Sequence, residues 1–451
     1  MQVLWERCAG LDVHRDTVVA TVRLPGQRRG SRTTETRTFK TTMRALNELG
    51  DWLACAQVQL VGMEATGVYR KPVFTSLESR FTCWLVNAAH LRNVPGRKTD
   101  VADSVWIARI LECGLVRPSF VPVQEFRELR DLTRARTAAA QERVRVIQRL
   151  EKVLQDAGIK LTSVASQVWS KTSRAVLEAL LEGVASPVEL AALAKGRLRS
   201  KRAELEEALE HRFRVEHHGV MVRGLLAHID ALEARVAAYD AEINARLGPH
   251  GAMFELVQSI PGVGPKVAQV MIAEIGLDMS VFPTSAHLAS WAGVCPGNHA
   301  SGGKRKGGRS RPGPKWLKLA LTEAAWGAVK SKGTYLSAHH MQIKGRAGGY
   351  KALGATRHDI VVAYWHVVHD QVGAPHLALG LQAWRAAHRA AHAGHARPAA
   401  DQQEQLQHAL EDLARSRWAH PRDQRRAQRR RTAMGEVARQ DDSRATAPLR
   451  L

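Results

Sequence analysis

Short apolar runs alternate with polar turns over the first 90 residues. β-Branched and apolar stretches predict strands at 8–11, 17–24, 37–41, 58–63 and 83–86, and the spacing of apolar positions predicts a helix over 45–56. Hairpin strands come first, and strands alternating with helices follow. We therefore predict an α/β domain over residues 1–122.

From residue 125 the pattern becomes helical. Residues 125–158 repeat apolar positions at helical spacing, and a second long helix is expected from about Lys201, bent near Gly219. Its later half carries apolar residues four and three apart, at Leu225, Ile229, Leu232, Val236, Tyr239 and Ile243. Such a heptad seam favours coiled-coil pairing of helices, either within the chain or between subunits. We predict a helical, coiled-coil region over residues 123–252.

A third unit, also helical, is predicted over residues 253–370. Its first two helices meet at Ile260–Lys266, a turn that resembles a helix-hairpin-helix. In such a turn Gly262 and Gly264 let backbone N–H groups approach a phosphate, and Lys266 adds positive charge. A Pro-Gly helix connector without a ligand is the alternative.

A glycine-rich basic loop follows at residues 293–313, before helices predicted at 316–330 and 356–368. The loop lacks the spacing of a Walker-A motif, so contact with a phosphate backbone is the simpler account. Candidate nucleic-acid contacts are the turn glycines and the nearby cations, together with two cations before residue 100: Gly262, Gly264, Lys266, Lys304, Arg305, Lys306, Arg309, Arg311, Arg97 and Lys98.

Charge and cysteine content narrow the function further. A net charge of +23 indicates a polyanionic partner such as nucleic acid, although a basic protein with no such partner remains open. Residues 371–451 read as a basic, partly disordered tail.

The five cysteines contain no Cys-x-x-Cys pair, which argues against a zinc ribbon or a disulfide framework. Without a signal peptide or a membrane-spanning run, we expect a soluble cytoplasmic protein.

Four acids stand where the predicted α/β domain would place an active site. Asp12 and Glu64 follow strands, and Asp100 and Asp103 share one face of a helix start. Taken alone, the last two fit an acidic helix cap. Together the four carboxylates offer the hard oxygen ligands of a site for two Mg²⁺ or Mn²⁺ ions, which stabilise the attacking and leaving oxygens of a phosphodiester. The order of elements is that of a ribonuclease-H-like domain.

Six short motifs resemble one family of bacterial enzymes. Residues 10–14, 63–69 and 98–103 look like the three acidic motifs of the DEDD transposases of insertion sequences. Residues 260–264, 291–296 and 300–303 resemble the second domain of the same proteins, the insertion-sequence one-ten family related to Piv-type invertases. The resemblance extends from about Cys8 to Val368. Where the family has Lys-x-Gly-Asn, this chain has Arg311-Pro312-Gly313-Pro314, which retains the charge and lacks the asparagine.

This resemblance implies a RuvC-like catalytic domain and a second, serine-bearing transposase domain. The metal-binding acids would act with Ser301, which would hold the cut strand as a phosphoserine; without the resemblance, Ser301 reads as a loop serine that bonds its own backbone. The family also implies donor and target DNA, a structured bridge RNA that guides recognition, and a homodimer or homotetramer whose active sites combine domains of different protomers.

Three other functions remain open from the residues. A RuvC-like junction resolvase would use the same acids with a metal-activated water and leave no covalent adduct. An actin-like or sugar-kinase-like ATPase also begins with an Asp after its first strand, although no adenosine-binding glycine pair stands out. A non-enzymatic nucleic-acid-binding protein would use the acids as caps and surface charges, and its behaviour would not depend on metal.

Overall fold

The computed structural model describes residues 3–28, 30–65, 67–88, 91, 103–165, 169–184, 186–297, 299–302, 304–306, 310–371 and 373. Met1–Gln371 forms one compact unit, divided from Val372–Leu451. The fold below is that of the first unit. Apart from Gln371 and Gly373, the predicted basic tail lies outside the described residues.

A five-stranded mixed sheet forms the core of the N-terminal part, in the order β3-β2-β1-β4-β5. Its strands are β1 Cys8–Val13, β2 Thr17–Pro25, β3 Arg32–Lys40, β4 Leu60–Glu64 and β5 Thr82–Val86. β1, β2 and β3 pair antiparallel, whereas β4 runs parallel to β1 and β5 parallel to β4. The predicted α/β class is confirmed. β3 begins five residues before the predicted strand because its first half is polar and exposed at the sheet edge, where no apolar pattern marks it.

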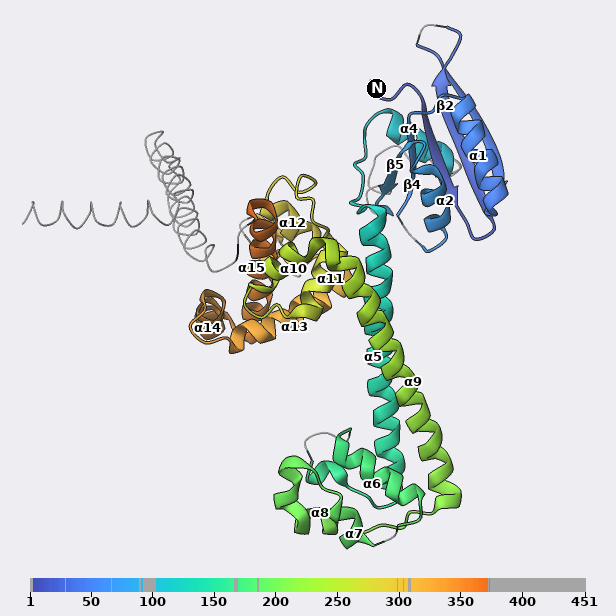
Figure 1. Cartoon of the computed structure of the whole chain (residues 1–451). Coiled ribbons are helices and arrows are strands. Elements are labelled where there is room, and N and C mark those ends of the chain that lie inside the picture. Colours follow the sequence, from blue (N-terminus) through green and yellow to red (C-terminus); the bar gives the residue numbers. More distant parts are fainter. Residues whose placement is uncertain are drawn as a thin grey trace, which may run out of the picture. The chain divides into compact units, whose positions relative to one another are not determined.

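Helices cover both faces of this sheet (Figure 1). α1 Met43–Cys55 and α2 Arg70–Leu77 pack against one face, in a core that includes Leu11, Leu49 and Met63. α4 Asp103–Glu112 packs against the other face, in a core that includes Cys8 and Ile107. Because strand side chains alternate between faces, odd-numbered residues of β1 face α1 and even-numbered residues face α4.

Two long helices, α5 Gln124–Asp156 and α9 Val220–Leu247, pack side by side (Figure 1). Ile229 and Leu232 of the predicted heptad seam are fully buried in one core with Val146 and Leu150 of α5, so a partner helix within the chain covers this part of the seam. The chain between them forms α6 Lys171–Leu181, α7 Pro187–Ala192 and α8 Arg202–Ala208.

The predicted helix from Lys201 is interrupted earlier than expected. α8 ends at Ala208, and a non-helical stretch follows in which Leu209 is fully buried. A π-helical turn, Val215–Gly219, then leads into α9, so the bend predicted near Gly219 is present. Leu209, directly after the end of α8, lies in the core shared with α5.

The third part is helical, as predicted. Its elements are α10 Gly251–Gln258, α11 Pro265–Ile275, α12 Ser285–Trp291, the hairpin strands β6 His299–Ser301 and β7 Lys304–Lys306, α13 Lys315–Lys330, α14 Tyr335–Ala347 and α15 Gly349–Asp370. The sequence pattern missed α14, which buries only Leu336 and His340, and it began α15 seven residues late. In the described part of the chain, no helix is long and apolar enough to cross a membrane.

Candidate active site

Asp12 and Glu64 lie beside each other at the ends of neighbouring parallel strands. The register pairs Cys8 with Leu60 and Gly10 with Gly62, so its next step along the same face brings Asp12 opposite Glu64. Both residues are even-numbered positions of their strands, on the face that α4 covers. The sheet therefore presents two predicted ligands on one face, at the carboxyl ends of the adjacent strands β1 and β4.

The third acid, Asp103, is the first residue of α4, and two glycines bring this helix close to the sheet. A Cβ on Gly10 would lie 2.2 Å from the carbonyl oxygen of Ser104 and 2.4 Å from the backbone nitrogen of Ala108. A Cβ on Gly62 would lie 2.3 Å from a methyl group of Leu111. Because no side chain separates the helix from β1, the start of α4 lies against the strand that carries Asp12.

Polar contacts on β2 hold α4 in place. The Ser104 hydroxyl lies 2.9 Å from that of Thr21, which lies 2.9 Å from the Thr36 hydroxyl on β3. At the other end of α4, the buried carboxylate of Glu112 accepts a 2.7 Å hydrogen bond from Arg23 Nε and pairs with Arg32. A carboxylate that is 3% exposed costs much free energy unless it is paired, so these two arginines fix the helix end.

The electrostatics of Asp12 indicate that the acids are close. Burial raises the pKa of the Asp12 carboxyl above its ordinary value of 3.8, and the negative charges of Asp103 and Glu64 raise this pKa further. His14 acts in the opposite direction, since its Nε2 lies 3.1 Å from Asp12 Oδ2. The sequence motif contained His14, but the pattern alone gave it no role; the structure places its ring against the carboxylate two residues before it.

The donor set fits a hard divalent cation. Asp12, Glu64 and Asp103 offer carboxylate oxygens, the ligands that Mg²⁺ and Mn²⁺ prefer. An added cation would offset the repulsion that, in addition to burial, raises the pKa of Asp12. The fourth predicted ligand, Asp100, lies outside the described residues, as do Arg97 and Lys98.

The predicted nucleophile stands at the end of a hairpin strand. The loop predicted at residues 293–313 contains β6 and β7, in which Ser301 pairs with Lys304 across a two-residue turn. Gly302 in this turn has φ +57°, a conformation that favours glycine. Only the backbone of this strand pair is described, so the side chains of Ser301, Lys304, Arg305 and Lys306 lie outside the described part, and Arg309 is not described at all.

The remaining predicted contacts have structural roles in the third part. Gly262 has φ +85°, and a Cβ there would lie 2.2 Å from the Ala324 carbonyl oxygen, so this glycine lets α13 pack against the turn. Gly264 caps α11, and the Nζ atom of Lys266 lies 3.8 Å from an oxygen of Asp240. Arg311 is exposed and accepts a 2.7 Å hydrogen bond at its backbone oxygen from Lys318 Nζ. Whether these residues contact nucleic acid stays a prediction.

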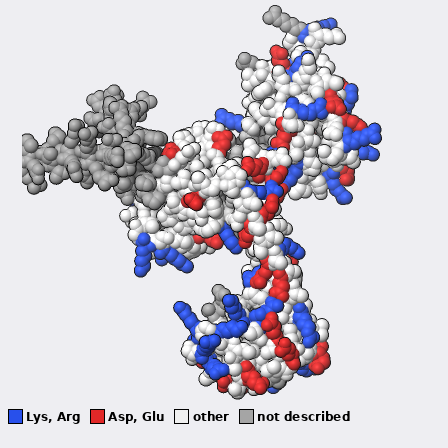
Figure 2. All heavy atoms as spheres, viewed as in Figure 1, with Lys and Arg blue, Asp and Glu red and all other residues white. Residues whose placement is uncertain are grey.

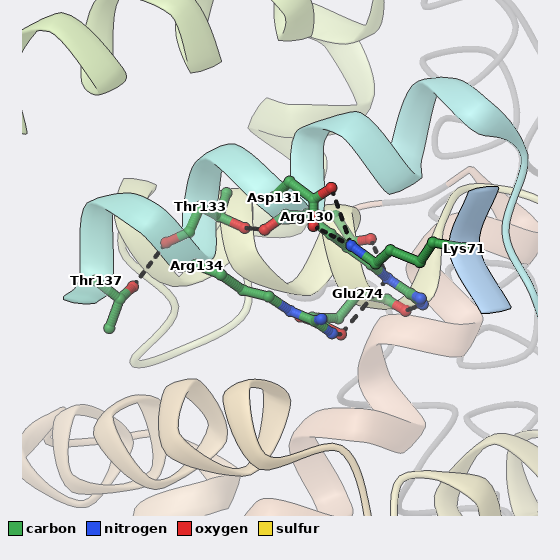
Figure 3. Close-up of polar contacts among 8 residues, drawn as sticks. Lys71, Arg130, Asp131, Thr133, Arg134, Thr137 and Glu274 are labelled. Atoms are coloured by element: carbon green, nitrogen blue, oxygen red, sulfur yellow. Dashed lines mark hydrogen bonds and ion pairs between the residues drawn. The ribbon is translucent and has the colours of Figure 1, made fainter. Parts of the chain in front are cut away.

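A buried charge cluster joins α5 to the end of α11 (Figure 3). The guanidinium of Arg134 donates two hydrogen bonds, of 2.7 and 2.9 Å, to the carboxylate of Glu274, whose side chain is 1% exposed. Arg130 donates to the backbone oxygens of Ala273, at 3.0 Å, and of Glu274. The residue after Arg130, Asp131, pairs with Lys71 of α2 at 3.0 Å. α5 thus connects the sheet domain to the domain that carries Ser301.

Comparisons with known proteins agree with this division into two parts. A family model described as "Transposase", for DEDD transposases of the IS110 type, matches residues 9–159. A second model, described as "Transposase IS116/IS110/IS902 family", matches residues 254–341. The first match contains the four acids and the second contains Ser301.

Two curated proteins are similar over part of the chain. The "Insertion element IS110 uncharacterized 43.6 kDa protein" of Streptomyces coelicolor is 34% identical over 113 residues, which is 25% of this chain and 27% of that protein. The "Probable family 20 transposase" of Pseudomonas aeruginosa is 30% identical over 113 residues, which is 25% of this chain and 33% of that protein. The chain thus matches about a third or less of the length of these relatives.

The two family models describe the same group of proteins and cover successive parts of one chain. Together they match just over half of the 451 residues, and both curated relatives carry names of the same kind. The chain belongs to the IS116/IS110/IS902 family of transposases.

Proposed function

We propose that this protein is a metal-dependent recombinase that moves an insertion sequence by cutting and rejoining DNA through a phosphoserine. Asp12, Glu64, Asp100 and Asp103 would bind Mg²⁺ or Mn²⁺, and Ser301 would be the nucleophile. The observation that carries the proposal is the meeting of Asp12 and Glu64 in register with the start of α4. Burial is the main cause of the raised pKa of Asp12, and the negative charges of Asp103 and Glu64 add to it. This added effect supports three carboxylates gathering where one cation could bind them.

The chemistry divides between the two parts of the chain. When bound, the metal ions supply charge that stabilises the attacking and leaving oxygens of the phosphodiester. A bond forms between Ser301 Oγ and the phosphorus, the bond from phosphorus to one sugar oxygen breaks, and the hydroxyl proton passes to that leaving oxygen. Attack by a strand-end hydroxyl of another DNA end reverses these steps and releases the serine. Glu64 and Asp103 would hold the metal ions in a fixed position, since Glu64 ends strand β4 and Asp103 begins helix α4.

Nucleic acids are the proposed partners. The net charge of +23 suits binding of donor and target DNA, and the family resemblance extends the proposal to a structured bridge RNA. We also propose a homodimer or homotetramer in which Ser301 of one protomer meets the acids of another. The two hydrogen bonds between Arg134 and Glu274 support a fixed position of α11 on α5 within each protomer. An active site that combines two protomers would therefore form without separating α11 from α5.

The test is formation of a covalent protein–DNA adduct. The full-length protein is copurified with RNA transcribed from the flanks of its gene, incubated with labelled donor DNA and Mg²⁺, and denatured before electrophoresis. We expect an adduct in the wild type and none in Ser301→Ala, with Ser310→Ala in the same loop as the matched control. Asp12→Asn should also form no adduct. An adduct of normal yield in Ser301→Ala would refute the role of this serine.

The contact between His14 and Asp12 favours a second candidate, hydrolysis by a RuvC-like nuclease or junction resolvase. An imidazole that donates its Nε2–H to a metal-binding carboxylate 3.1 Å away can accept a proton from an attacking water at Nδ1. This candidate predicts free cut ends without an adduct, activity in Ser301→Ala and loss of cutting in His14→Ala. Recombination that survives His14→Ala would exclude it.

A further inference from the structure

The corner between α14 and α15 is exposed along eight consecutive residues. Lys344-Gly345-Arg346-Ala347-Gly348-Gly349-Tyr350-Lys351 closes α14 and opens α15, and every one of these residues is exposed. We call this segment the basic corner. It lies beyond residues 254–341, where the second family model ends.

The surroundings of the basic corner are cationic. The sequence contains no Asp or Glu between Glu323 and Asp359, whereas this interval holds six cations: Lys330, Lys332, Lys344, Arg346, Lys351 and Arg357. Figure 2 shows blue side chains gathered over α14 and the adjoining end of α13. Among the described residues, no acid pairs with Lys344, Arg346 or Lys351. The Arg346 Nε–H donates a 3.4 Å hydrogen bond to the backbone oxygen of Gln342, which leaves its charge unneutralised.

Tyr350 stands out among the aromatic residues of this part. It is 94% exposed, whereas Tyr364 on the same helix is fully buried and donates a hydrogen bond to the Gly276 carbonyl oxygen. A tyrosine ring gains free energy by packing against other groups, and this ring has no covering side chain in the described structure. The ring therefore has both faces available for stacking.

The glycines of the corner leave room for a partner's backbone. Gly348 has φ +84°, so the turn itself requires a glycine there. Gly345 lies within α14 and Gly349 begins α15, and a Cβ at either position would meet nothing within 4 Å. Glycine inside a helix lowers its stability relative to alanine, and neither packing nor backbone conformation accounts for these two. Glycine allows the closest approach of another chain.

We propose that the basic corner binds unpaired nucleotides, with Tyr350 stacked on a base and Lys344, Arg346 and Lys351 against the phosphates on either side. The proposal rests on the proposed function, which makes nucleic acid the substrate. A single strand is favoured over a duplex because a fully exposed ring can stack only on a base that is not already stacked and paired. An acidic protein surface would match the charges but would give the ring no such partner.

The first experiment measures binding of the full-length protein to labelled oligonucleotides of one sequence, as single-stranded RNA, single-stranded DNA and duplex DNA. From the energy of base–aromatic stacking, we expect Tyr350→Ala to weaken single-strand binding roughly tenfold or more, and Tyr350→Phe to retain it. Duplex binding should change little. Comparing single-stranded RNA with single-stranded DNA shows which of the two the basic corner recognises: it is the one whose binding is tighter and is weakened more by Tyr350→Ala.

Charge variants test the phosphate contacts. Lys344→Glu with Arg346→Glu should reduce the salt dependence of single-strand binding by about 0.7 in the logarithmic slope for each phosphate that the protein no longer neutralises. Arg44→Glu with Lys201→Glu, at side chains that are 92% and 47% exposed and far from the corner in sequence, removes the same charge; this matched control should change the slope less. Equal slopes in both variants would refute a local site at the corner.

Photocrosslinking locates the base directly. A single strand that carries 5-iodouracil should crosslink to Tyr350, and peptide mapping should find the adduct in residues 344–351. If Tyr350→Ala binds single strands like the wild type and crosslinks elsewhere, the proposal is overturned. It is equally overturned if Tyr350→Ala changes only the oligomeric state in sedimentation, which would assign the ring to a contact between copies of this chain.

The failure of this proposal and that of the proposed function are separable. The covalent adduct is measured in the same variants. If the wild type forms the adduct and Tyr350→Ala binds single strands normally, the proposed function is supported and nucleotide binding at the basic corner is refuted. If the wild type forms no adduct but its single-strand binding depends on Tyr350, the phosphoserine mechanism is refuted and nucleotide binding at the basic corner is supported.

Discussion

The carbonyl oxygen of Ser104 lies 2.2 Å from the point that a Cβ on Gly10 would occupy. No side chain fits between β1 and α4 at this point, so the helix rests directly on the strand. Asp103 precedes Ser104 and Asp12 follows Gly10 by two residues on the same face. The separation of the strand and the helix that carry these carboxylates is therefore set by a contact between backbones, which cannot relax as a flexible side chain can.

Gly10→Ala should displace α4 and weaken the site. The added methyl group meets backbone atoms of Ser104 and Ala108, and overpacking of this kind costs roughly 1–3 kcal/mol or more. We expect a lower melting temperature and weaker Mg²⁺ binding. We also expect strand cutting to fall even at temperatures where the variant is fully folded. Gly224→Ala is the control: it lies exposed on α9 with open space around it, and alanine should stabilise that helix by about 1 kcal/mol. Normal cutting by Gly10→Ala would contradict this.

Asp12→Asn should stabilise the metal-free protein while it abolishes cutting. Burial raises the folded-state pKa of Asp12 above 3.8, helped by the charges of Asp103 and Glu64, so the folded state holds this proton more tightly than the unfolded state does. The stability from this proton is complete below pH 3.8 and is lost as pH rises through the raised folded-state pKa. At neutral pH in EDTA, unfolding by urea should therefore show Asp12→Asn to be the more stable protein.

The same comparison over pH provides the check. The advantage of Asp12→Asn should shrink as pH falls toward 3.8, because wild-type Asp12 then takes up its proton. An advantage that is constant with pH would assign the effect to something other than ionisation of this carboxyl.

Mg²⁺ should reverse the order of stability. Bound cation stabilises only the folded state, by about 2.7 kcal/mol when its concentration is a hundred times the dissociation constant. The wild type should therefore melt at a higher temperature as Mg²⁺ is added, and Asp12→Asn should not. Lys201→Ala, which alters an exposed ion pair with Glu204 distant in sequence from the acids, serves as the control and should respond like the wild type. A wild type that melts at the same temperature with Mg²⁺ and with EDTA would remove the metal site.

Glu274→Ala should destabilise the link between α5 and α11. Its carboxylate is 1% exposed and binds Arg134 through two hydrogen bonds, so its removal leaves a partly buried guanidinium unpaired, at a cost of about 3–5 kcal/mol. Asp131→Ala, which breaks an ion pair whose side chains are 57% and 62% exposed, should cost at most about 1 kcal/mol. Urea unfolding of both variants measures the difference, and similar midpoints would show that the buried pair does not stabilise the fold.

The local elements of this protein could be predicted from its sequence wherever one face of an element is apolar. β1, β2, β4 and β5 and the long helices α5 and α9 carry such faces, and their existence was predicted. β3 was predicted too short and α14 was missed, because an exposed edge strand and a surface helix with two buried residues carry almost no apolar signal. The motifs likewise indicated the family, since they are runs of adjacent residues.

The order of amino acids was enough to show which residues are acidic, where the strands that carry Asp12 and Glu64 end, and that the chain is strongly basic. The folded chain was needed to show that these two strands are neighbours in register, that Gly10 lets α4 bring Asp103 to them, and that His14 returns to Asp12. It was also needed to show that Gly262 is a packing position and that Tyr350 is uncovered. The difference arises because hydrophobic periodicity reports which face of an element is buried, whereas the identity of the element that buries it is settled by packing between distant segments.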